Sequence, residues 1–241
     1  MKILVKINQL KNMSPSPSPA VTRSTKAQTT SAPTATSRSP RAPEATKRQI
    51  LDAAEEEFAL RGLGGARTEV IANLAGVAPR MIYYYFQSKE GLYQAVLQRP
   101  VSEFQDALRE LNLDGLPAEE ALRVFLQTTI PYEVAHRYRG MLLFQEANQN
   151  QGKYFKLTNW EKPLATLTGI LERGRQEGVF RELEPYMTTL AIAGVCTFYA
   201  NAHENLKHLT PDQDLLSAEL IERYTQAAID LVLRGILRSA E

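Results

Sequence analysis

Residues 66–89 read ARTEVIANLAGVAPRMIYYYFQSK, and this stretch decides the fold. Apolar residues recur at helical spacing on both sides of a break at residues 75–78. They are Ile71 and Leu74 before the break, and Ile82 and Phe86 after it. Gly76 suits the sharp reversal, because a left-handed backbone costs glycine almost nothing. The stretch therefore predicts two short helices joined by a tight turn, which is the helix-turn-helix unit.

The second helix of this unit has the faces of a helix that reads the major groove of DNA. At about 100° per residue, Ile82 and Phe86 define its buried side, and Arg80 points away from them. Arginine can donate two parallel hydrogen bonds to guanine, the commonest specific base contact, and tyrosine hydroxyls can bind phosphate oxygens. The alternative is an ordinary helix with half-buried tyrosines at residues 83–85. Three consecutive side chains cannot all face one core, so the DNA interpretation is favoured.

Four sequence fragments stand in order over residues 46–96. They are an Ile-Leu-x-Ala-Ala…Phe-Ala…Gly first helix, Ile-Ala…Ala-Gly-Val, Tyr-Tyr-x-Phe and Ser-Lys-Glu-x-Leu. At these spacings they resemble the DNA-binding domain of the TetR family of transcriptional regulators. The resemblance implies a symmetric DNA-binding regulator with a helical body, and together with the helix faces it predicts the DNA-binding residues. These are Arg67, Thr68, Pro79, Arg80, Met81, Tyr83, Tyr84, Tyr85 and Lys89.

Two positions depart from the family pattern. Family members usually have Ser or Thr where Ala78 stands, and this chain lacks that helix-capping hydroxyl, which is worth roughly 1 kcal/mol. Thr is frequent where Met81 stands, so a phosphate contact is missing there, although Met81 can touch a thymine methyl group. These changes alter the sequence that is read rather than the mode of reading.

Length and composition are those of an ordinary soluble protein. The 241 residues suffice for one large or two small domains. The single cysteine, Cys196, excludes an intrachain disulfide and predicts a reducing, cytoplasmic location. Residues 1–43 carry seven Lys and Arg and no acid, which leaves −6 for residues 44–241 of a chain with net charge +1.

Residues 1–43 form a basic tail rich in Ser, Thr, Pro and Ala, with no apolar periodicity. Such a segment cannot bury enough surface to offset the entropy of ordering, so it is predicted to be disordered. Its first seven residues are too short and too interrupted by Lys for a signal peptide or membrane span. The tail either adds non-specific attraction to phosphates or is an inert extension; we favour the second.

The rest of the chain predicts an all-α protein of about nine helices, because no segment has the pattern of a strand. A DNA-binding domain is expected at residues 44–98 and a helical effector-binding and dimerisation domain at residues 99–241. Thr46 is expected to cap the first helix, which ends at Gly62 and carries Glu55 mostly outside. Ser88 is expected to cap the fourth helix, which Pro100 should kink.

Further helices follow in the body. They are expected from Pro117 to a bend or end at Pro131, with a short segment to His136, then over residues 139–148, up to Glu177, from Pro185 to about residue 206, and over residues 216–239. The last two have apolar bands wider than one neighbouring helix can cover. Two such pairs across a two-fold axis would form a four-helix bundle, which predicts a homodimer. The alternative is a core contained within one chain.

A mostly apolar cavity with a few polar groups is expected in the body and would suit a small organic effector. The candidate ligand-binding residues are Phe104, Phe125, Tyr132, His136, Phe144, Gln145, Asn148, Trp160 and Phe198. No catalytic motif is present, and His203 and His208 are wrongly spaced for two metal ligands on one helical face. We therefore expect no enzyme, cofactor or metal. We predict a transcriptional regulator that acts as a repressor and is released from a palindromic operator by a small organic effector. The alternative is a helical small-molecule-binding protein or enzyme in which the helix-turn-helix is a structural relic.

Overall fold

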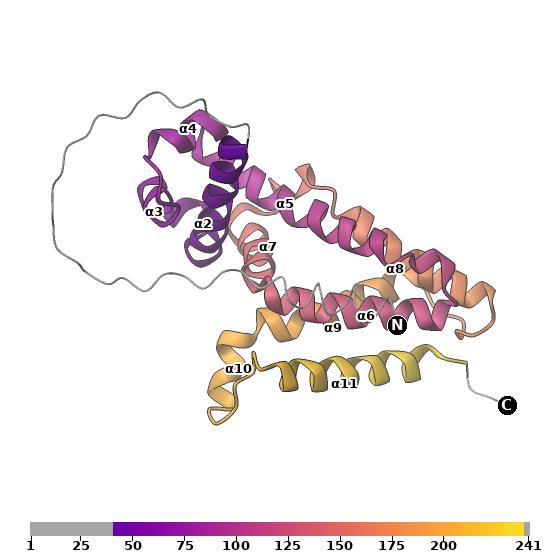
Figure 1. Cartoon of the computed structure of the whole chain (residues 1–241). Coiled ribbons are helices and arrows are strands. Elements are labelled where there is room, and N and C mark those ends of the chain that lie inside the picture. Colours follow the sequence, from indigo (N-terminus) through magenta and orange to yellow (C-terminus); the bar gives the residue numbers. More distant parts are fainter. Residues whose placement is uncertain (1–40, 239–241) are drawn as a thin grey trace.

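The computed structural model describes residues 41–238 of the chain. This part is all-helical as predicted, with ten α-helices, two short 3₁₀ segments and no strand (Figure 1). The predicted disordered tail lies almost entirely outside the described residues. In chain order the elements are α2 (Arg41–Gly65), α3 (Thr68–Leu74), α4 (Arg80–Phe86), α5 (Lys89–Glu110), η1 (Leu113–Gly115), α6 (Ala118–Ala135), α7 (Arg137–Asn150), η2 (Phe155–Leu157), α8 (Glu161–Gln176), α9 (Pro185–Asn201), α10 (His203–Leu209) and α11 (Ala218–Ile236).

Helices α2, α3 and α4 gather at one end of the molecule and form the head (Figure 1). Helix α2 begins at Arg41, so Thr46 lies inside it rather than capping it, contrary to expectation. The backbone leaves the helical conformation at Gly62, with φ of 66°, which is where the sequence predicted the end. Phe58 is fully buried at the centre of the head and meets the ring of Tyr93 edge-on at 5.0 Å.

Helix α5 connects the head to the body. Its N-cap is Ser88, as predicted, and the Ser88 hydroxyl accepts a hydrogen bond of 2.9 Å from the Gly91 backbone N–H. Gly91 is required because a Cβ there would lie 2.2 Å from the Phe86 carbonyl oxygen, where the end of α4 approaches α5. The helix continues through Pro100 to Glu110, so one rod carries residues of both the head and the body.

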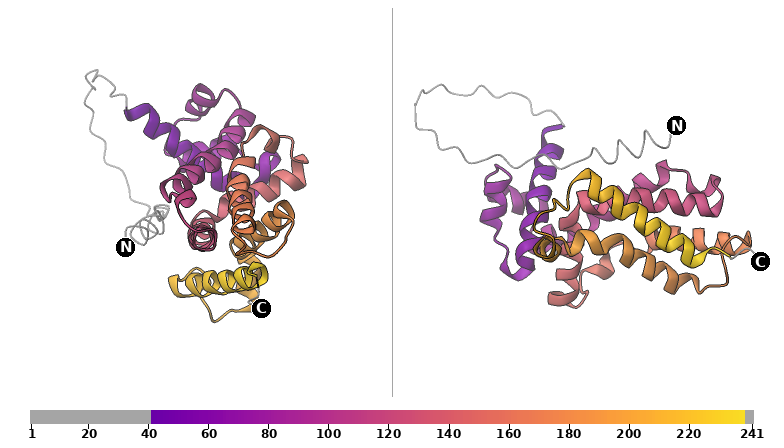
Figure 2. Two further views of the ribbon diagram at one scale, coloured as in Figure 1. Left: turned by 90° about the vertical axis from the view of Figure 1, so that its right-hand side faces the viewer. Right: turned by 90° about the horizontal axis from the view of Figure 1, so that it is seen from below.

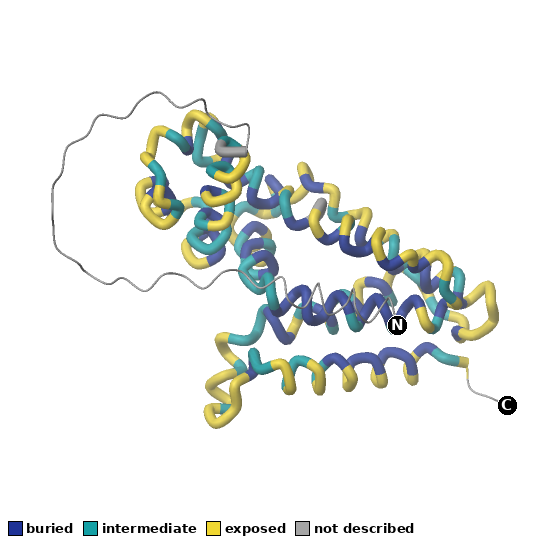
Figure 3. The backbone as a smooth tube through the Cα atoms, in the orientation of Figure 1, coloured by how far each residue is buried: buried dark blue, intermediate teal, exposed yellow. Residues whose placement is uncertain are grey.

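The body is built around α6, which is buried on nearly all sides (Figure 3). Pro131 does not end α6, which runs to Ala135. The helix predicted from Pro185 to residue 206 is two helices, α9 and α10, that meet at Ala202. No glycine or proline marks that break, which is why the sequence pattern ran across it.

Helices α9 and α11 lie side by side on one outer face of the body when the molecule is seen from below (Figure 2). The Tyr224 hydroxyl of α11 donates a hydrogen bond of 2.6 Å to the Val195 carbonyl of α9, and the Tyr224 ring stacks on Tyr199 at 4.5 Å. In Figure 3 the edge of α11 that faces the body is buried and the opposite edge is exposed. The outer face formed by α9 and α11 is the one for which the sequence predicted dimer contacts.

Candidate functional site

The outer face of α4 presents the side chains that were predicted to read DNA. Arg80 is exposed at the first turn, Tyr84 is 76% exposed and Tyr83 is 49% exposed. Ile82 and Phe86 on the opposite side are buried in the head, as predicted. The helix therefore offers a guanidinium and two phenols to the outside from a backbone that is fixed by its apolar side.

The turn before α4 sets the angle of this helix. Gly76 adopts φ of 66°, which confirms the left-handed turn predicted from the sequence. Pro79 occupies the N-cap with helical backbone angles rather than the first turn, and no side chain caps the helix, as expected from Ala78. The Met81 and Ile82 N–H groups of the first turn instead donate to the Ala78 and Pro79 carbonyls, at 2.8 Å and 3.1 Å.

Two of the residues that were predicted to bind DNA form hydrogen bonds within the head. Thr68 is only 6% exposed, and its hydroxyl lies 3.2 Å from the Tyr83 hydroxyl. Lys89 Nζ donates a long hydrogen bond of 3.4 Å to the Gly64 carbonyl. Thr68 therefore orients the Tyr83 phenol on α4. Arg67, directly before α3, is exposed.

The remaining predicted contacts lie on the edges of the same surface. Met81 and Tyr85 are half-buried and pack partly on the head core. The Tyr85 ring meets the Tyr84 ring edge-on at 5.0 Å, which restricts both phenols. The nine predicted residues thus include an exposed set centred on Arg80 and Tyr84, and a partly buried set that supports it.

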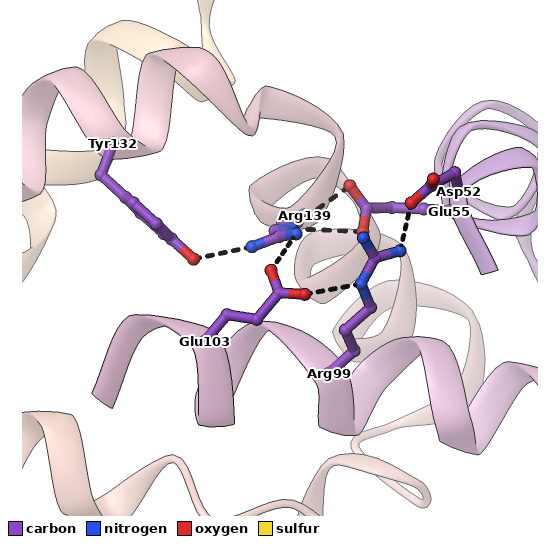
Figure 4. Close-up of polar contacts among 6 residues, drawn as sticks. All are labelled: Asp52, Glu55, Arg99, Glu103, Tyr132 and Arg139. Carbon is purple, nitrogen blue, oxygen red and sulfur yellow. Dashed lines mark hydrogen bonds and ion pairs between the residues drawn. The ribbon is translucent and has the colours of Figure 1, made fainter. Parts of the chain in front are cut away.

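A network of charged side chains joins the head to the body behind this surface (Figure 4). At its centre is Arg139 of α7, which is 4% exposed. Its guanidinium contacts Glu55 of α2 at 3.2 Å, Glu103 of α5 at 2.6 Å and the Tyr132 hydroxyl of α6 at 2.7 Å. One arginine therefore ties a helix of the head to three helices of the body. We call this group, with Asp52 and Arg99, the Arg139 network.

Arg99 of α5 extends the Arg139 network. Its Nε donates a hydrogen bond of 2.8 Å to Glu103, and its guanidinium forms an ion pair with Asp52 of α2. Burial raises the pKa of Glu55 above its ordinary value despite the nearby Arg139 charge. Burial acts in the same direction on Glu103, but hydrogen bonds from Arg99 and the charge of Arg139 outweigh it, so the pKa of Glu103 is lowered.

The position of Glu55 corrects one sequence expectation. The acids of the first helix were expected to lie mostly outside, but the Glu55 side chain is only 13% exposed and faces the body. Two neighbouring acids also accept hydrogen bonds, Glu56 from the Tyr138 hydroxyl at 3.5 Å and Glu57 from the Arg67 backbone N–H at 3.4 Å. A run of acids in an amphipathic helix does not reveal which one meets a buried cation elsewhere in the chain.

The nine candidate ligand-binding residues do not line one cavity. Phe104, Tyr132 and His136 do come together, with ring centroids 5.0 Å and 4.5 Å apart, beside Arg139. Burial, together with the Arg139 charge, lowers the pKa of His136 to about 4. Phe125 is buried in the body core.

The other candidates lie elsewhere. Phe144 is 57% exposed on α7, where Asn148 is also exposed and Gln145 is half-buried. Phe198 is 60% exposed on the outer side of α9. Trp160 is half-buried at the N-cap of α8. The sequence does not show which side of each amphipathic helix faces the interior of the body. The predicted aromatic residues therefore lie in several different places.

Phe198 belongs instead to the outer face of α9 and α11. Leu190 on α9 is 42% exposed and Leu231 on α11 is 68% exposed, so three large apolar side chains are open to solvent on these two helices. Small residues separate them along both helices, Gly194 on α9 and Ala227 on α11, and both are exposed. These side chains lie on the two helices for which the sequence predicts dimer contacts.

The sequence analysis did not single out Arg139, Arg99 and Glu103, the charged residues that join the head to the body. Each is a common surface residue type at an unremarkable helical position, and only the packing of α2, α5 and α7 brings them together. Within residues 41–238, no group of His, Cys, Asp and Glu side chains could hold a metal ion, and no helix has the length and apolar character needed to cross a bilayer.

Comparison with known proteins matches both parts of the chain. A family model described as bacterial regulatory proteins of the tetR family matches residues 50–96, and one described as a tetracyclin repressor-like C-terminal domain matches residues 118–232. The HTH-type transcriptional repressor NicS of Pseudomonas putida is 33% identical over 204 residues, which cover 80% of this chain and 93% of NicS. The HTH-type transcriptional regulator RutR of Escherichia coli is 39% identical over 100 residues, 40% of this chain and 47% of RutR.

Solved structures share the fold. FadR from Bacillus subtilis, in complex with stearoyl-CoA, aligns with a TM-score of 0.62 and 23% identity over 78% of this chain and 98% of its own. The fatty acid degradation regulator FadR from Bacillus halodurans aligns with a TM-score of 0.59 and 24% identity over 80% of this chain and 97% of its own. At these identities the likeness establishes the arrangement of helices.

Proposed function

Since the chain belongs to the TetR family of bacterial regulatory proteins, and is therefore a DNA-binding transcriptional regulator, we propose that it is a dimeric repressor that a small organic effector releases from a palindromic operator. The observation that carries the proposal is the outer face of α4, where Arg80 and Tyr84 are exposed on a helix whose other side is fixed in the head. The relation to NicS, a repressor, over 93% of its length supports repression rather than activation.

Arg80 is proposed to read a base, and Tyr83 and Tyr85 to position the helix on phosphates. Arg80→Ala should weaken binding to the selected operator by roughly 1–3 kcal/mol and relax the preference at one base pair in each half-site. Arg175→Ala, an exposed arginine on α8 far from the head, is the control and should leave operator affinity unchanged. Genomic fragments selected by the purified protein would supply the operator, and affinities on base-substituted operators would supply the measurement. Uniform weakening on every sequence would make Arg80 a phosphate contact.

The two heads are proposed to be held at the spacing of successive major grooves, about 34–36 Å, by a four-helix contact between α9 and α11 of two copies. Leu231→Glu would place an unpaired charge in that contact and should split the dimer. Leu209→Glu is the matched control, since Leu209 is 77% exposed but lies on α10, away from this face. Light scattering on both variants distinguishes the two, and a monomeric unmodified protein would refute the dimer.

The effector is proposed to act through α5 and the Arg139 network. Helix α5 contributes Tyr93 to the head core and Phe104 to the body core, so a shift of its body half must also move groups in the head. The Arg139 network joins α5 and α7 to α2 of the head at the same level. An effector changes operator affinity only by its different affinity for the two arrangements. Operator affinity measured with and without effector gives that coupling directly.

No retention on any genomic fragment at low salt would contradict the proposal and favour the alternative of a small-molecule-binding protein with a relic head. Retention that falls steeply with salt concentration, and is specific for a palindrome, is the expected result.

A further inference from the structure

Positive charge is distributed unevenly along the chain. The basic tail carries six Lys and Arg before α2 and no acid, since its seventh cation, Arg41, is the first residue of α2. Residues 41–98, which form the head and the start of α5, carry seven Lys and Arg and seven Asp and Glu. Residues 99–241 carry 15 Lys and Arg and 20 Asp and Glu, a net charge of −5. The basic tail therefore supplies the net positive charge of the whole chain.

The head itself offers little net attraction to DNA. Arg67 is exposed directly before α3, but Glu69 is exposed in the first turn of the same helix. Glu90 is exposed in the first turn of α5, beside Lys89, whose Nζ donates to the Gly64 carbonyl. Double-stranded DNA carries one negative charge per about 1.7 Å of its axis, and the attraction that does not depend on sequence comes from Lys and Arg that neutralise phosphates. A head with equal numbers of acids and bases leaves that attraction to another part of the chain.

The basic tail joins the folded protein at the head. Helix α2 begins at Arg41, and in Figures 1 and 2 its start lies on the side of the head away from α9 and α11. In Figure 1 the same side of the head carries α4. Arg38 stands three residues before Arg41, and a chain spans at most about 3.6 Å per residue, so the two Cα atoms are no more than about 11 Å apart. The last cation of the tail is therefore held close to the head by the chain itself.

We infer that the basic tail is a second DNA-binding element, whose Lys and Arg side chains neutralise phosphates beside the half-site of α4 and do not read bases. Basic N-terminal arms that bind nucleic acid are a recurrent use of such a run of charge. The sequence alone favoured an inert extension, and the balanced charge of the head, together with the place where the tail joins it, reverses that preference. The inference rests on the DNA-binding function of the family, and it concerns affinity rather than the sequence that is read.

The test measures binding of the full-length protein to a duplex of random sequence at several salt concentrations. Arg23→Gln, Lys26→Gln and Arg38→Gln together remove three charges from the basic tail. Each phosphate contact contributes roughly 0.9 to the slope of log affinity against log salt, so the slope of this tail variant should be smaller by about 2.7 for each protomer bound. Between about 50 mM and about 200 mM salt, the unmodified protein should then lose roughly 40-fold more affinity per protomer than the tail variant.

A body variant controls for net charge. Lys156→Gln, Lys162→Gln and Arg175→Gln remove three charges from exposed positions of η2 and α8. This body variant should keep the slope of the unmodified protein. Arg23→Lys with Arg38→Lys retains the charge of the tail and should also keep the slope. Thermal unfolding of the tail variant should match that of the unmodified protein, because its substitutions lie outside the described helices.

Two comparisons can overturn the inference. Equal slopes of the unmodified protein and the tail variant would do so, as would an equal loss of slope in the body variant, which would show a general effect of net charge. Vesicles of phosphatidylserine present the other large anionic surface of a cell. Tail-dependent binding that is tighter to these vesicles than to the duplex, at equal phosphate concentration, would overturn the inference in favour of a membrane surface.

Operator binding by the same proteins separates this inference from the proposed function. The tail should contribute equally to binding of the operator and of the random duplex, so the ratio of the two affinities should be the same in the tail variant. Tail-dependent binding of the random duplex without preference for any operator would refute the repressor and leave the tail as a DNA-binding element. Operator binding with a salt slope that does not depend on the tail would refute this inference and leave the repressor.

Discussion

Helix α2 meets the rest of the molecule through two neighbouring contacts of different character, which we call the apolar side and the charged side. On one side Phe58 packs with Tyr93, which in turn meets Tyr154 edge-on at 5.4 Å. On the other side Glu55 meets the buried guanidinium of Arg139. Apolar contact depends little on direction and survives small displacements, whereas a charge-assisted hydrogen bond is lost when its geometry is lost. The apolar side therefore holds the head, and the charged side fixes one particular arrangement of it.

A buried charged contact is weak evidence of stability. Desolvation of buried ion pairs often exceeds their mutual attraction, so an apolar junction of the same shape is often as stable. Even the apolar side contains one buried acid, Glu146, but that acid is fully satisfied by the Tyr93 hydroxyl at 2.9 Å and by the Tyr154 backbone N–H at 2.6 Å. The contrast is consistent with an Arg139 network that distinguishes two arrangements of the head.

Truncating Phe58 tests how much the apolar side contributes to stability. Phe58→Ala should lower the free energy of unfolding by roughly 3–5 kcal/mol, because it removes a fully buried ring from a packed core. Leu60→Ala on the same helix is the control, since Leu60 is 50% exposed, and should cost less than about 0.5 kcal/mol. Urea denaturation measures both. A similar loss for the two variants would show that the core is not centred on Phe58.

The second change breaks the charged side. Arg139→Met should lower the free energy of unfolding by about 3 kcal/mol, because it leaves Glu55 and Glu103 without their buried partner. It should also reduce the effect of effector on operator affinity, which Phe58→Ala should leave intact in the fraction that remains folded. Adding Glu55→Gln to Arg139→Met should restore part of the stability by neutralising the more buried acid. Full stability in the single variant would show that the Arg139 network contributes nothing to the junction.

Much of the head could be predicted from the sequence, because local rules determine it. The glycine turn at Gly76, the cap at Ser88 and the alternation of Ile82 with the exposed residues of α4 each act within one or two helical turns. These rules do not show that Thr68 is buried against Tyr83, which depends on how α3 crosses α4.

The junction and the body could not be predicted in the same way. Arg139 meets Glu55 across 84 positions of the chain, and no pattern within either helix indicates the other.

Glu133 of α6 is a further buried acid that is influenced by the charge of Arg139. Burial raises the pKa of Glu133 to about 7, although the charge of Arg139 acts in the opposite direction. A raised folded-state pKa means that the folded protein holds a proton that the unfolded chain releases near pH 4.3. Its contribution is therefore fully present below about pH 4.3 and is lost as the pH rises to about 7.

Glu133→Gln removes this titration. Between these pH values the unmodified protein should lose roughly 3 kcal/mol relative to Glu133→Gln. The difference between the two proteins must be used, because His136, with its pKa lowered to about 4, titrates in the same range with the opposite sign. Denaturation curves at several pH values supply the measurement, and a constant difference would show that Glu133 is already ionised in the folded protein.

The smallest effect on stability is expected where the two sides meet along α5. Pro100 follows Arg99 of the Arg139 network and lies between Leu97 of the head core and Phe104 of the body core. Proline inside a helix removes a backbone hydrogen bond and favours a bend, so the two halves of α5 can swing. We expect Pro100→Ala to change the free energy of unfolding by less than about 1 kcal/mol, because the regained bond is offset by the greater freedom of the unfolded chain. Effector binding should persist while its effect on operator affinity falls, since the heads must keep a fixed spacing to fit successive grooves. If the coupling is the same in both proteins, the bend is only tolerated, and the switch lies in the Arg139 network alone.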